Sequence, residues 1–309
     1  MNRTIVVTGA SGFVGNHSVV RLLDDGETVR AVVRNAAGKD LVLQAVAQAE
    51  ANAAGLEFVT ATLDDESGWD SALEGADGVL HHASPFPAAE PDDPEHIIRP
   101  ARDGALRVLA AARRQNVRRV VLTSSFAAVG YSRHSGEPYT EADWTDGEDT
   151  SLPAYIRSKA LAERAAWKFA ADGGPELVVV NPTGIFGPAL SPKLSVSVEM
   201  VAALRSGQSL SGPGRPFTIV DVRDVVELHL RALDAPEAVG RRFIASSGRP
   251  VTVEWMARVL AEGPGVAAPA TDTPPISAEA ARNILGWGPR DPASTILDTA
   301  DSLPGLLPA

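Results

Sequence analysis

The sequence predicts an α/β fold in which a doubly wound parallel sheet carries a smaller C-terminal lobe. Runs rich in Val, Ile and Leu alternate with helical segments up to residue 180, as expected for parallel strands buried on both faces. The first run leads through a glycine-rich turn into a helix. After Asn181 closely spaced prolines and glycines break the alternation. The length of 309 residues suits one large domain with an appended lobe.

The alternating part defines the predicted elements, which we expect right-handed crossovers to join. The predicted strands are Thr4–Thr8, Thr28–Val33, Leu56–Thr60, Gly78–His81, Arg119–Thr123 and Leu177–Val180. The predicted helices are Val14–Asp24, Leu41–Ala54, Ser67–Leu73, Ala101–Gln115 and Tyr155–Ala171.

Residues 182–309 are expected to form mainly a substrate-binding lobe, interleaved with the sheet domain of residues 1–181. Short elements and frequent prolines characterise this part. Its predicted helices are Val196–Ser206, Val222–Ala235, Thr252–Ala261 and Ser277–Leu285. The Ala- and Pro-rich segment Gly263–Pro275 predicts an exposed loop.

The glycine-rich turn of residues 9–15 (GASGFVG) lies between the first predicted strand and helix. Gly9 allows the tight turn, Gly12 lets a pyrophosphate approach the backbone, and Gly15 lets the helix pack on the strand. Free N–H groups at the helix N-terminus attract the anion. A second strand at Thr28–Val33 completes a β-α-β unit. Residues 1–181 are therefore expected to be a Rossmann-type dinucleotide-binding domain; a turn that binds nothing is the alternative.

The end of the second strand indicates which dinucleotide binds. An NAD site usually carries Asp or Glu there, about 20 residues past the glycines, whereas an arginine suits the 2′-phosphate of NADP. This strand ends in Val33-Arg34-Asn35, and no carboxylate precedes Asp40. Arg34 offers a planar fork for phosphate, and Lys39 adds a second positive charge. We predict a preference for NADPH; a solvated loop arginine is the alternative.

Tyr155 and Lys159 lie four residues apart on a predicted helix, so they share one face. An ammonium near a phenol lowers the pKa of the tyrosine, which can then give a proton to a carbonyl oxygen or take one from an alcohol. Ser125 closes the run Thr123-Ser124-Ser125 at a predicted strand end, where a hydroxyl can hydrogen-bond a substrate oxygen. A surface pair and a polar strand end are the alternatives.

The glycine turn, the serine after the fifth strand and the Tyr155/Lys159 pair together resemble the extended short-chain dehydrogenase/reductase family. The resemblance covers almost the whole chain. It is closest to the NADPH-dependent aldehyde and ketone reductases related to dihydroflavonol reductase and cinnamoyl-CoA reductase. The further similar segments are residues 82–86 (HASPF), 181–188 (NPTGIFGP), 217–225 (FTIVDVRDV) and 285–290 (LGWGPR).

The resemblance implies roles for the matched positions. Ser125, the second serine of its pair, would be the catalytic serine and Tyr155 the general acid. Lys159 would tune the pKa of Tyr155 and bind the nicotinamide ribose, and Pro182 to Ile185 would border the nicotinamide. The residues expected to contact the cofactor are Thr8, Gly9, Ser11, Gly12, Phe13, Val14, Gly15, Arg34, Lys39, Leu63, Ala83, Ser84, Tyr155, Lys159, Pro182, Thr183 and Ile185.

Two positions depart from the family pattern. Many members carry an asparagine on the helix before the fifth strand that supports a proton relay, and this chain has Ala101 there. Any relay must then use water or another group. Many members also carry an acidic residue after the third strand that binds the adenine amine, and the matching position is Thr62. Backbone contacts of the following Leu63 stay open as a way to bind adenine.

Composition narrows the class of protein and partner. The formal charge of −11 argues against a nucleic-acid partner, and the absence of cysteine excludes disulfides and cysteine metal sites. The chain starts with a strand, so no signal peptide is expected, and no apolar run approaches the ~18 residues of a membrane span. We expect a cytoplasmic protein without a membrane partner that is a monomer or a homodimer.

No metal site is predicted from the remaining ionisable residues. His81 and His82 are neighbours on a strand and point to opposite faces, which favours strand-end packing over a shared metal. Asp92, Asp93 and Glu95 fall in a proline-rich loop and are expected to be solvated.

Two features before and around the predicted site have open interpretations. The acidic stretch Glu141–Asp149 is either part of a substrate entrance or simple surface. Trp144, Phe86 and Phe186 are either walls of an apolar pocket or core residues.

The leading hypothesis is NADPH-dependent, reversible reduction of a small ketone or aldehyde to an alcohol, by an oxidoreductase acting on CH–OH groups. One alternative is a sugar-nucleotide epimerase or dehydratase with tightly bound NAD. Arg34 and the valine run before Asn181 count against it. Another alternative is a protein that senses NADP(H) without catalysis, and the retained Ser-Tyr-Lys set counts against that.

Overall fold

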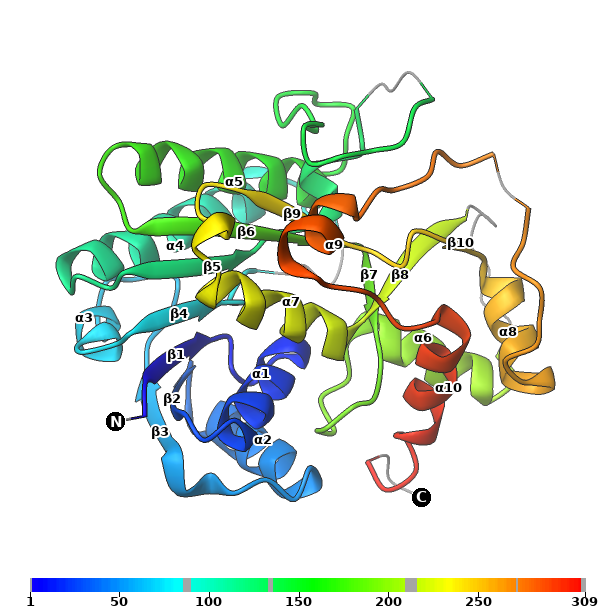
Figure 1. Cartoon of the computed structure of the whole chain (residues 1–309), viewed down its shortest axis with the longest axis horizontal. Helices are drawn as coiled ribbons and strands as arrows, with labels where there is room; N and C mark the ends of the chain where they lie inside the picture. Colours follow the sequence, from blue (N-terminus) through cyan, green and yellow to red (C-terminus); the bar gives the residue numbers. More distant parts are fainter. Residues whose placement is uncertain (1, 86–89, 133–135, 209–215, 271, 307–309) are drawn as a thin grey trace.

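The computed structural model describes residues 2–85, 90–132, 136–208, 216–270 and 272–306, which form a doubly wound α/β fold (Figure 1). Its main sheet has seven parallel strands in the order β3-β2-β1-β4-β5-β6-β9. The strand order reverses between β1 and β4, where open α/β sheets bind their ligands. The strands are β1 (Thr4–Thr8), β2 (Thr28–Val33), β3 (Leu56–Thr60), β4 (Gly78–His81), β5 (Arg119–Thr123), β6 (Glu176–Pro182) and β9 (Arg242–Ala245).

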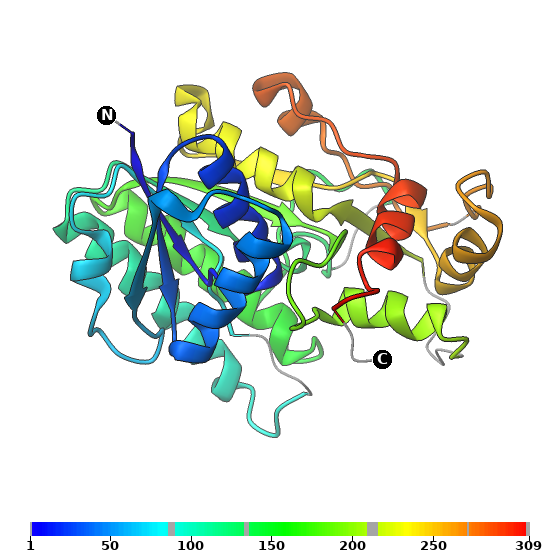
Figure 2. The same ribbon diagram turned by 90° about the horizontal axis from the view of Figure 1, so that it is seen from below.

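Helices cover both faces of the main sheet (Figures 1 and 2). One face carries α1 (Phe13–Asp24), α2 (Ala36–Gln48) and α7 (Val222–Asp234), and the other carries α3 (Trp69–Leu73), α4 (Glu95–Arg114) and α5 (Ala154–Ala171). Along β1 the side chains alternate between the two cores: Ile5 and Val7 face the first and Val6 the second. None of the described helices is long and apolar enough to cross a membrane.

A smaller lobe with its own core lies beside the carboxyl edge of the main sheet (Figure 2). It packs Phe186, Trp255 and Met256 together. Its elements are β7 (Gly184–Phe186), β8 (Phe217–Asp221), β10 (Pro250–Val251), α6 (Val196–Arg205), α8 (Val253–Glu262) and α10 (Pro292–Asp301). The strand β8 pairs parallel with β7 and antiparallel with β10.

The chain after residue 181 contributes to both parts of the molecule. Besides the lobe it forms α7, β9 and α9 (Glu279–Leu285), and residues such as Phe243, Leu285 and Trp287 belong to the core of the main sheet. The division into residues 1–181 and 182–309 stays a prediction. Short 3₁₀ turns complete the described structure: η1 (Ala53–Gly55), η2 (Phe126–Ala128) and η3 (Pro236–Ala238).

The predicted helix Leu41–Ala54 is wrong in its bounds. The helix α2 starts earlier, at Ala36, because the side chain of Asn35 caps it by accepting a hydrogen bond from the Gly38 N–H at 3.0 Å. It ends at Gln48, and Glu50 then adopts a positive φ of 54°. A cap followed by glycine in the first turn conceals a helix start when only apolar periodicity is read.

Other differences concern short or proline-containing elements. The helix α4 begins at Glu95, before the predicted Ala101, and contains Pro100 in its second turn, where the missing N–H leaves the His96 carbonyl without its helical partner. The strand β6 extends the predicted Leu177–Val180 at both ends. The strands β7 to β10 and the helix α10 were not predicted, since very short strands are defined by their pairing partners more than by their own residues.

Candidate active site

A cavity of about 1050 Å³ lies at the carboxyl ends of the central strands and is lined from both the sheet domain and the lobe. It brings together residues predicted separately from the glycine turn, the fifth strand and the fifth helix. The predicted residues that line it are Gly9, Ser11, Gly12, Phe13, Val14, Gly15, Arg34, Leu63, Ala83, Ser84, Ser125, Tyr155, Lys159, Pro182, Thr183 and Ile185.

The glycine turn has the close backbone approaches that the pattern predicts. Gly9 adopts a positive φ of 64°, and a Cβ there would lie 2.8 Å from the Ala83 backbone nitrogen. A Cβ on Gly15 would lie 2.1 Å from the Gly9 carbonyl oxygen, so only glycine lets α1 pack this close. Gly12 is the N-cap of α1 and has no side chain to shield the helix N-terminus. The turn can therefore present backbone N–H groups to a phosphate.

Thr8 and Lys39 do not line the cavity, in contrast to the other residues expected to contact the cofactor. The Thr8 hydroxyl is buried beneath the turn, where its oxygen accepts a hydrogen bond from the Ala83 N–H at 3.1 Å and pairs with His81 Nδ1 at 2.7 Å. Lys39 lies on α2 with its ammonium 5.1 Å from the centre of the Phe58 ring. Thr8 thus fixes the exit of β4, and Lys39 adds charge only from outside the cavity.

Arg34 lies at the end of β2 and lines the cavity with an exposed side chain. Within the described residues it forms no ion pair with a carboxylate. The first turn of α2 lies near the glycine turn, since a Cβ on Gly38 would come 3.4 Å from the Ser11 hydroxyl. The guanidinium is therefore available to an anionic group bound between these two helix starts.

The region after β3 brings to the cavity one residue that was not expected there, Asp64. Leu63 and Asp64 line the cavity, whereas Thr62 is not among its lining residues. The Thr62 carbonyl accepts a hydrogen bond from Trp69 Nε1 at 2.8 Å, and the Leu63 carbonyl accepts one from Arg107. Asp64 thus brings a carboxylate to the cavity two residues after the position that lacks the family's acid.

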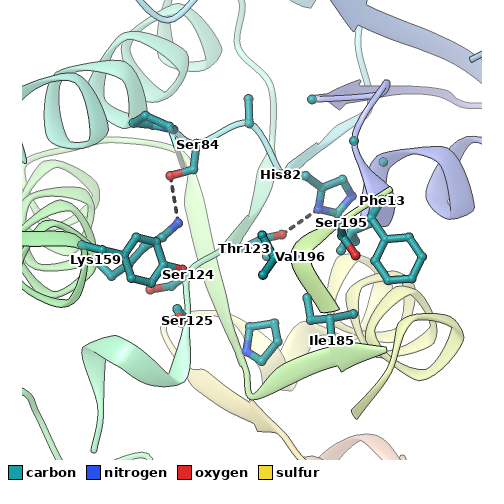
Figure 3. A pocket seen from close by; sticks show the side chains of 18 of the residues that line it. Phe13, His82, Ser84, Thr123, Ser124, Ser125, Lys159, Ile185, Ser195 and Val196 are labelled. Carbon is teal, nitrogen blue, oxygen red and sulfur yellow. Dashed lines mark hydrogen bonds between the residues drawn. The ribbon is translucent and has the colours of Figure 1, made fainter. Parts of the chain in front are cut away.

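The predicted catalytic residues meet at one point of the cavity. The Tyr155 hydroxyl and the Ser125 side chain are hydrogen-bonded. Lys159 donates a hydrogen bond from Nζ to the Ser84 hydroxyl at 2.8 Å (Figure 3), and its Nζ lies 5.6 Å from the centre of the Tyr155 ring. Ser124 instead donates to the Glu163 carboxylate at 2.6 Å. Of the two adjacent serines, the second is therefore the one that faces the tyrosine.

The expectation that the pKa of Tyr155 is lowered is wrong for this structure. Burial raises the pKa of Tyr155 above its usual value, and the hydrogen bond from Ser125 opposes that rise only in part. Burial also lowers the pKa of Lys159 to about 8, although the nearby Glu163 carboxylate favours its charged form. The lysine ammonium donates its hydrogen bond to Ser84.

Comparison with known proteins agrees with this geometry. Residues 5–245 match the model of the NAD dependent epimerase/dehydratase family. The chain belongs to this family. It is 36% identical to cinnamoyl-CoA reductase 1 of Arabidopsis thaliana over 269 residues, which cover 85% of this chain and 76% of that protein. It is 33% identical over 270 residues to the bifunctional dihydroflavonol 4-reductase/flavanone 4-reductase of Malus domestica, covering 84% of this chain and 76% of that protein.

A solved structure matches almost the full length. The yeast methylglyoxal/isovaleraldehyde reductase Gre2, crystallised with NADPH, superposes with a TM-score of 0.83 at 28% identity. The superposition covers 98% of this chain and 100% of Gre2. Together with the sequence relatives, this confirms the predicted branch of the family, whose named members are reductases.

The two adjacent histidines of this family member have separate partners, as their opposite directions predict. His82 lines the cavity and shares hydrogen bonds with the Thr123 hydroxyl at 2.6 Å and with Ser18 at 2.9 Å. His81 pairs with Thr8 on the neighbouring strand. Burial lowers the pKa of both histidines, so both are neutral near pH 7. Among the described residues no cluster of three or more His, Asp or Glu side chains is arranged to hold a metal ion.

The residues of the acidic stretch Glu141–Asp149, Trp144 among them, are not lining residues of the cavity, so Trp144 is not a wall of it, and the entrance interpretation of the stretch stays a prediction. Trp144 stacks instead on Arg242, whose guanidinium carbon lies 3.7 Å from the ring centre. Phe186 does line the cavity, and Phe86 lies outside the described residues.

Apolar and aromatic residues of the cavity, from the segment after β5 and from the lobe, were missed by sequence reasoning. They carry no chemical motif, and only their fold-dependent position makes them functional candidates. These lining residues are Phe126, Tyr131, Val196, Met200 and Phe217.

Proposed function

We propose that the protein is an NADPH-dependent reductase that converts a ketone or aldehyde to an alcohol, reversibly. The observation that carries this proposal is that Ser125, Tyr155 and Lys159 line one cavity together with the glycine turn. The same cavity then contains a proton donor, a hydrogen-bond donor for the substrate oxygen and a phosphate-binding turn. The three relatives reported above are all named as reductases, which supports the same reaction class.

The residues present fit NADPH. The glycine turn leaves its backbone open to a pyrophosphate, since side chains at Gly9 and Gly15 would collide with neighbouring backbone. Arg34 stands at the end of β2 where the 2′-phosphate is expected, and it has no carboxylate partner within the described part of the chain. Pro182, Thr183 and Ile185 line the same cavity, where they would border the nicotinamide.

The protein's own groups then have defined tasks in the reaction. NADPH, when bound, supplies a hydride to the carbonyl carbon. The Ser125 hydroxyl donates a hydrogen bond to the carbonyl oxygen and holds it beside Tyr155. The Tyr155 hydroxyl donates its proton to this oxygen as negative charge develops there. The Lys159 ammonium stabilises the phenolate that Tyr155 becomes, and Ala101 offers no group for returning the proton, so water does so.

The test is NADPH oxidation against a panel of aldehydes and ketones, with Tyr155→Phe beside the wild type. We expect turnover of some members of the panel, and a loss of ~100-fold or more in kcat for Tyr155→Phe with nearly unchanged NADPH binding. Tyr139→Phe is the matched control, because Tyr139 does not line the cavity. Full activity of Tyr155→Phe would contradict the mechanism.

Two other outcomes would replace the proposal. Purified protein that retains bound NAD and oxidises no NADPH would indicate a sugar-nucleotide epimerase or dehydratase. Protein that binds NADPH but consumes none with any member of the panel would indicate a sensor of NADP(H).

A further inference from the structure

A buried carboxylate lies directly behind the candidate catalytic residues. Glu163 follows Lys159 by one turn of α5 and is 1% exposed. One oxygen, Oε1, accepts hydrogen bonds from Arg242 Nε at 2.6 Å and from Trp167 Nε1 at 3.2 Å. The other, Oε2, accepts from the Ser124 hydroxyl at 2.6 Å and from Asn181 Nδ2 at 2.7 Å. Both oxygens are thus held by two donors each.

The partner of this carboxylate is equally buried. Arg242 on β9 is 8% exposed, and its remaining N–H groups donate to the backbone carbonyls of Glu141, Asp143 and Ala128. Its guanidinium stacks on the Trp144 ring. A buried ion pair contributes little net stability, because desolvation of the two charges offsets their attraction, and an apolar pair of similar volume is often as stable. Stability alone therefore does not explain why a charged pair occupies this place.

Two hydrogen bonds connect the carboxylate to the catalytic serine. Asn181 donates through the same Nδ2 to the Glu163 carboxylate and to the Ser125 carbonyl, the latter at 3.1 Å. Ser124, held by Glu163, is the residue immediately before Ser125, and both appear beside Lys159 in Figure 3. The backbone of Ser125 is therefore fixed from two sides while its hydroxyl remains directed to Tyr155.

A third connection is electrostatic. The groups facing Lys159 are Tyr155 and Glu163 on its own helix and His81 on β4. His81 is buried and neutral near pH 7, so the carboxylate of Glu163 is the charge that favours the ammonium form of Lys159. Arg242 is held on the far side of this carboxylate by its own hydrogen bonds.

We propose that Glu163 is a positioning residue for the reduction: it fixes the Ser124-Ser125 backbone so that Ser125 faces Tyr155, and it keeps Lys159 in its ammonium form. The inference rests on the proposed function. It gives the Glu163–Arg242 pair a role in the active site, where the pair aligns Ser125 with Tyr155 and favours the charged form of Lys159.

The decisive variant is Glu163→Gln, which keeps the side-chain volume and removes the charge. We expect kcat near pH 7 to fall about tenfold or more, with NADPH binding little changed. We also expect the alkaline limb of the kcat profile to move to lower pH by about one unit, because Lys159 then loses its proton more easily. Wild-type kcat together with an unmoved limb would overturn the proposal, whatever the change in Tm.

The matched control is Glu176→Gln. Glu176 pairs with the buried Arg119 at 2.9 Å between the amino ends of β5 and β6, away from the cavity. We expect this variant to change stability without moving the pH profile. If both Gln variants changed kcat and the alkaline limb alike, Glu163 would have no specific role.

Two measurements keep the inference testable if Glu163→Gln folds poorly or no substrate is found. Ser124→Ala leaves the ion pair intact and removes one link to the serine, so we expect kcat to fall roughly threefold to tenfold with an unmoved alkaline limb. Unchanged kcat in this variant would contradict the positioning role. Independently of turnover, the Lys159 ammonium should lose its proton at lower pH in Glu163→Gln than in the wild type, and an unchanged ionisation of Lys159, followed by NMR of its amine, would overturn the inference even in an inactive protein.

Discussion

The Lys159 ammonium donates a hydrogen bond to the Ser84 hydroxyl at 2.8 Å and thereby connects α5 to the chain that leaves β4. The ammonium is buried, and burial lowers its pKa from 10.5 to about 8. The folded state therefore bears the cost of enclosing a positive charge where an apolar side chain would be more stable. A residue kept at such a cost is expected to serve function rather than stability.

Lys159→Met is expected to abolish turnover and to raise the free energy of unfolding at pH 7 by about 1–3 kcal/mol. Near pH 7 the lysine is charged in both states, so the folded state bears the full cost. Between about pH 8 and pH 10.5 only the unfolded state still binds the proton, so wild-type stability gains from this group as pH rises. Urea unfolding at pH 7 and at alkaline pH measures both effects.

The exposed Lys168 on the same helix provides the control for this prediction. Lys168→Met should leave the unfolding free energy within about 0.5 kcal/mol of the wild type. A Lys159→Met protein less stable than the wild type at pH 7 would show that the hydrogen bond to Ser84 outweighs the burial cost.

Tyr155 is expected to ionise above the usual tyrosine pKa in the free protein. Burial is the main cause, and the hydrogen bond from Ser125 lowers the pKa in part. Ser125→Ala removes that stabilisation of the phenolate and should move the ionisation to still higher pH. Tyrosinate absorbance of the wild type minus that of Tyr155→Phe isolates this group, since the chain has only three tyrosines. Ionisation below the usual pKa would contradict the prediction.

The fold and most of the cofactor half of the site could be predicted because their signals are local. The turn from Gly9 to Gly15 requires glycine for backbone reasons, and that requirement is visible in sequence without knowing any partner. The Tyr155/Lys159 spacing likewise follows from one helix.

The rest of the site depends on contacts between segments far apart in the chain. The sequence around Glu163 and Arg242 does not indicate that the two side chains pair. Glu163 lies on α5 and Arg242 on β9, and between them the chain passes through β7, α6 and β8 of the lobe before β9 joins the main sheet. Trp144 illustrates the same limit: an aromatic residue is a reasonable pocket wall from sequence alone, but here it covers a guanidinium. Burial also reversed the expected pKa shift of Tyr155, and burial is set by tertiary packing.

Arg34 is expected to set the preference for NADPH over NADH. Arg34→Glu should reduce the ratio of kcat/KM for NADPH to that for NADH by ~100-fold, about 2.7 kcal/mol, because a guanidinium–phosphate pair is replaced by repulsion. Lys39→Glu changes the same charge outside the cavity and should have a much smaller effect. An unchanged ratio in Arg34→Glu would refute the assignment of Arg34.

Gly130 is expected to control the size of substrate that the cavity accepts. A Cβ at this position would lie 2.2 Å from Cζ of Phe126, a ring that lines the cavity and packs edge-on against Tyr139. Gly130→Ala should displace this ring and raise KM for bulky carbonyl substrates about tenfold, with little change for small aldehydes. Gly265→Ala, where a Cβ meets nothing within 4 Å, is the control. Equal KM changes for small and bulky substrates would contradict this role.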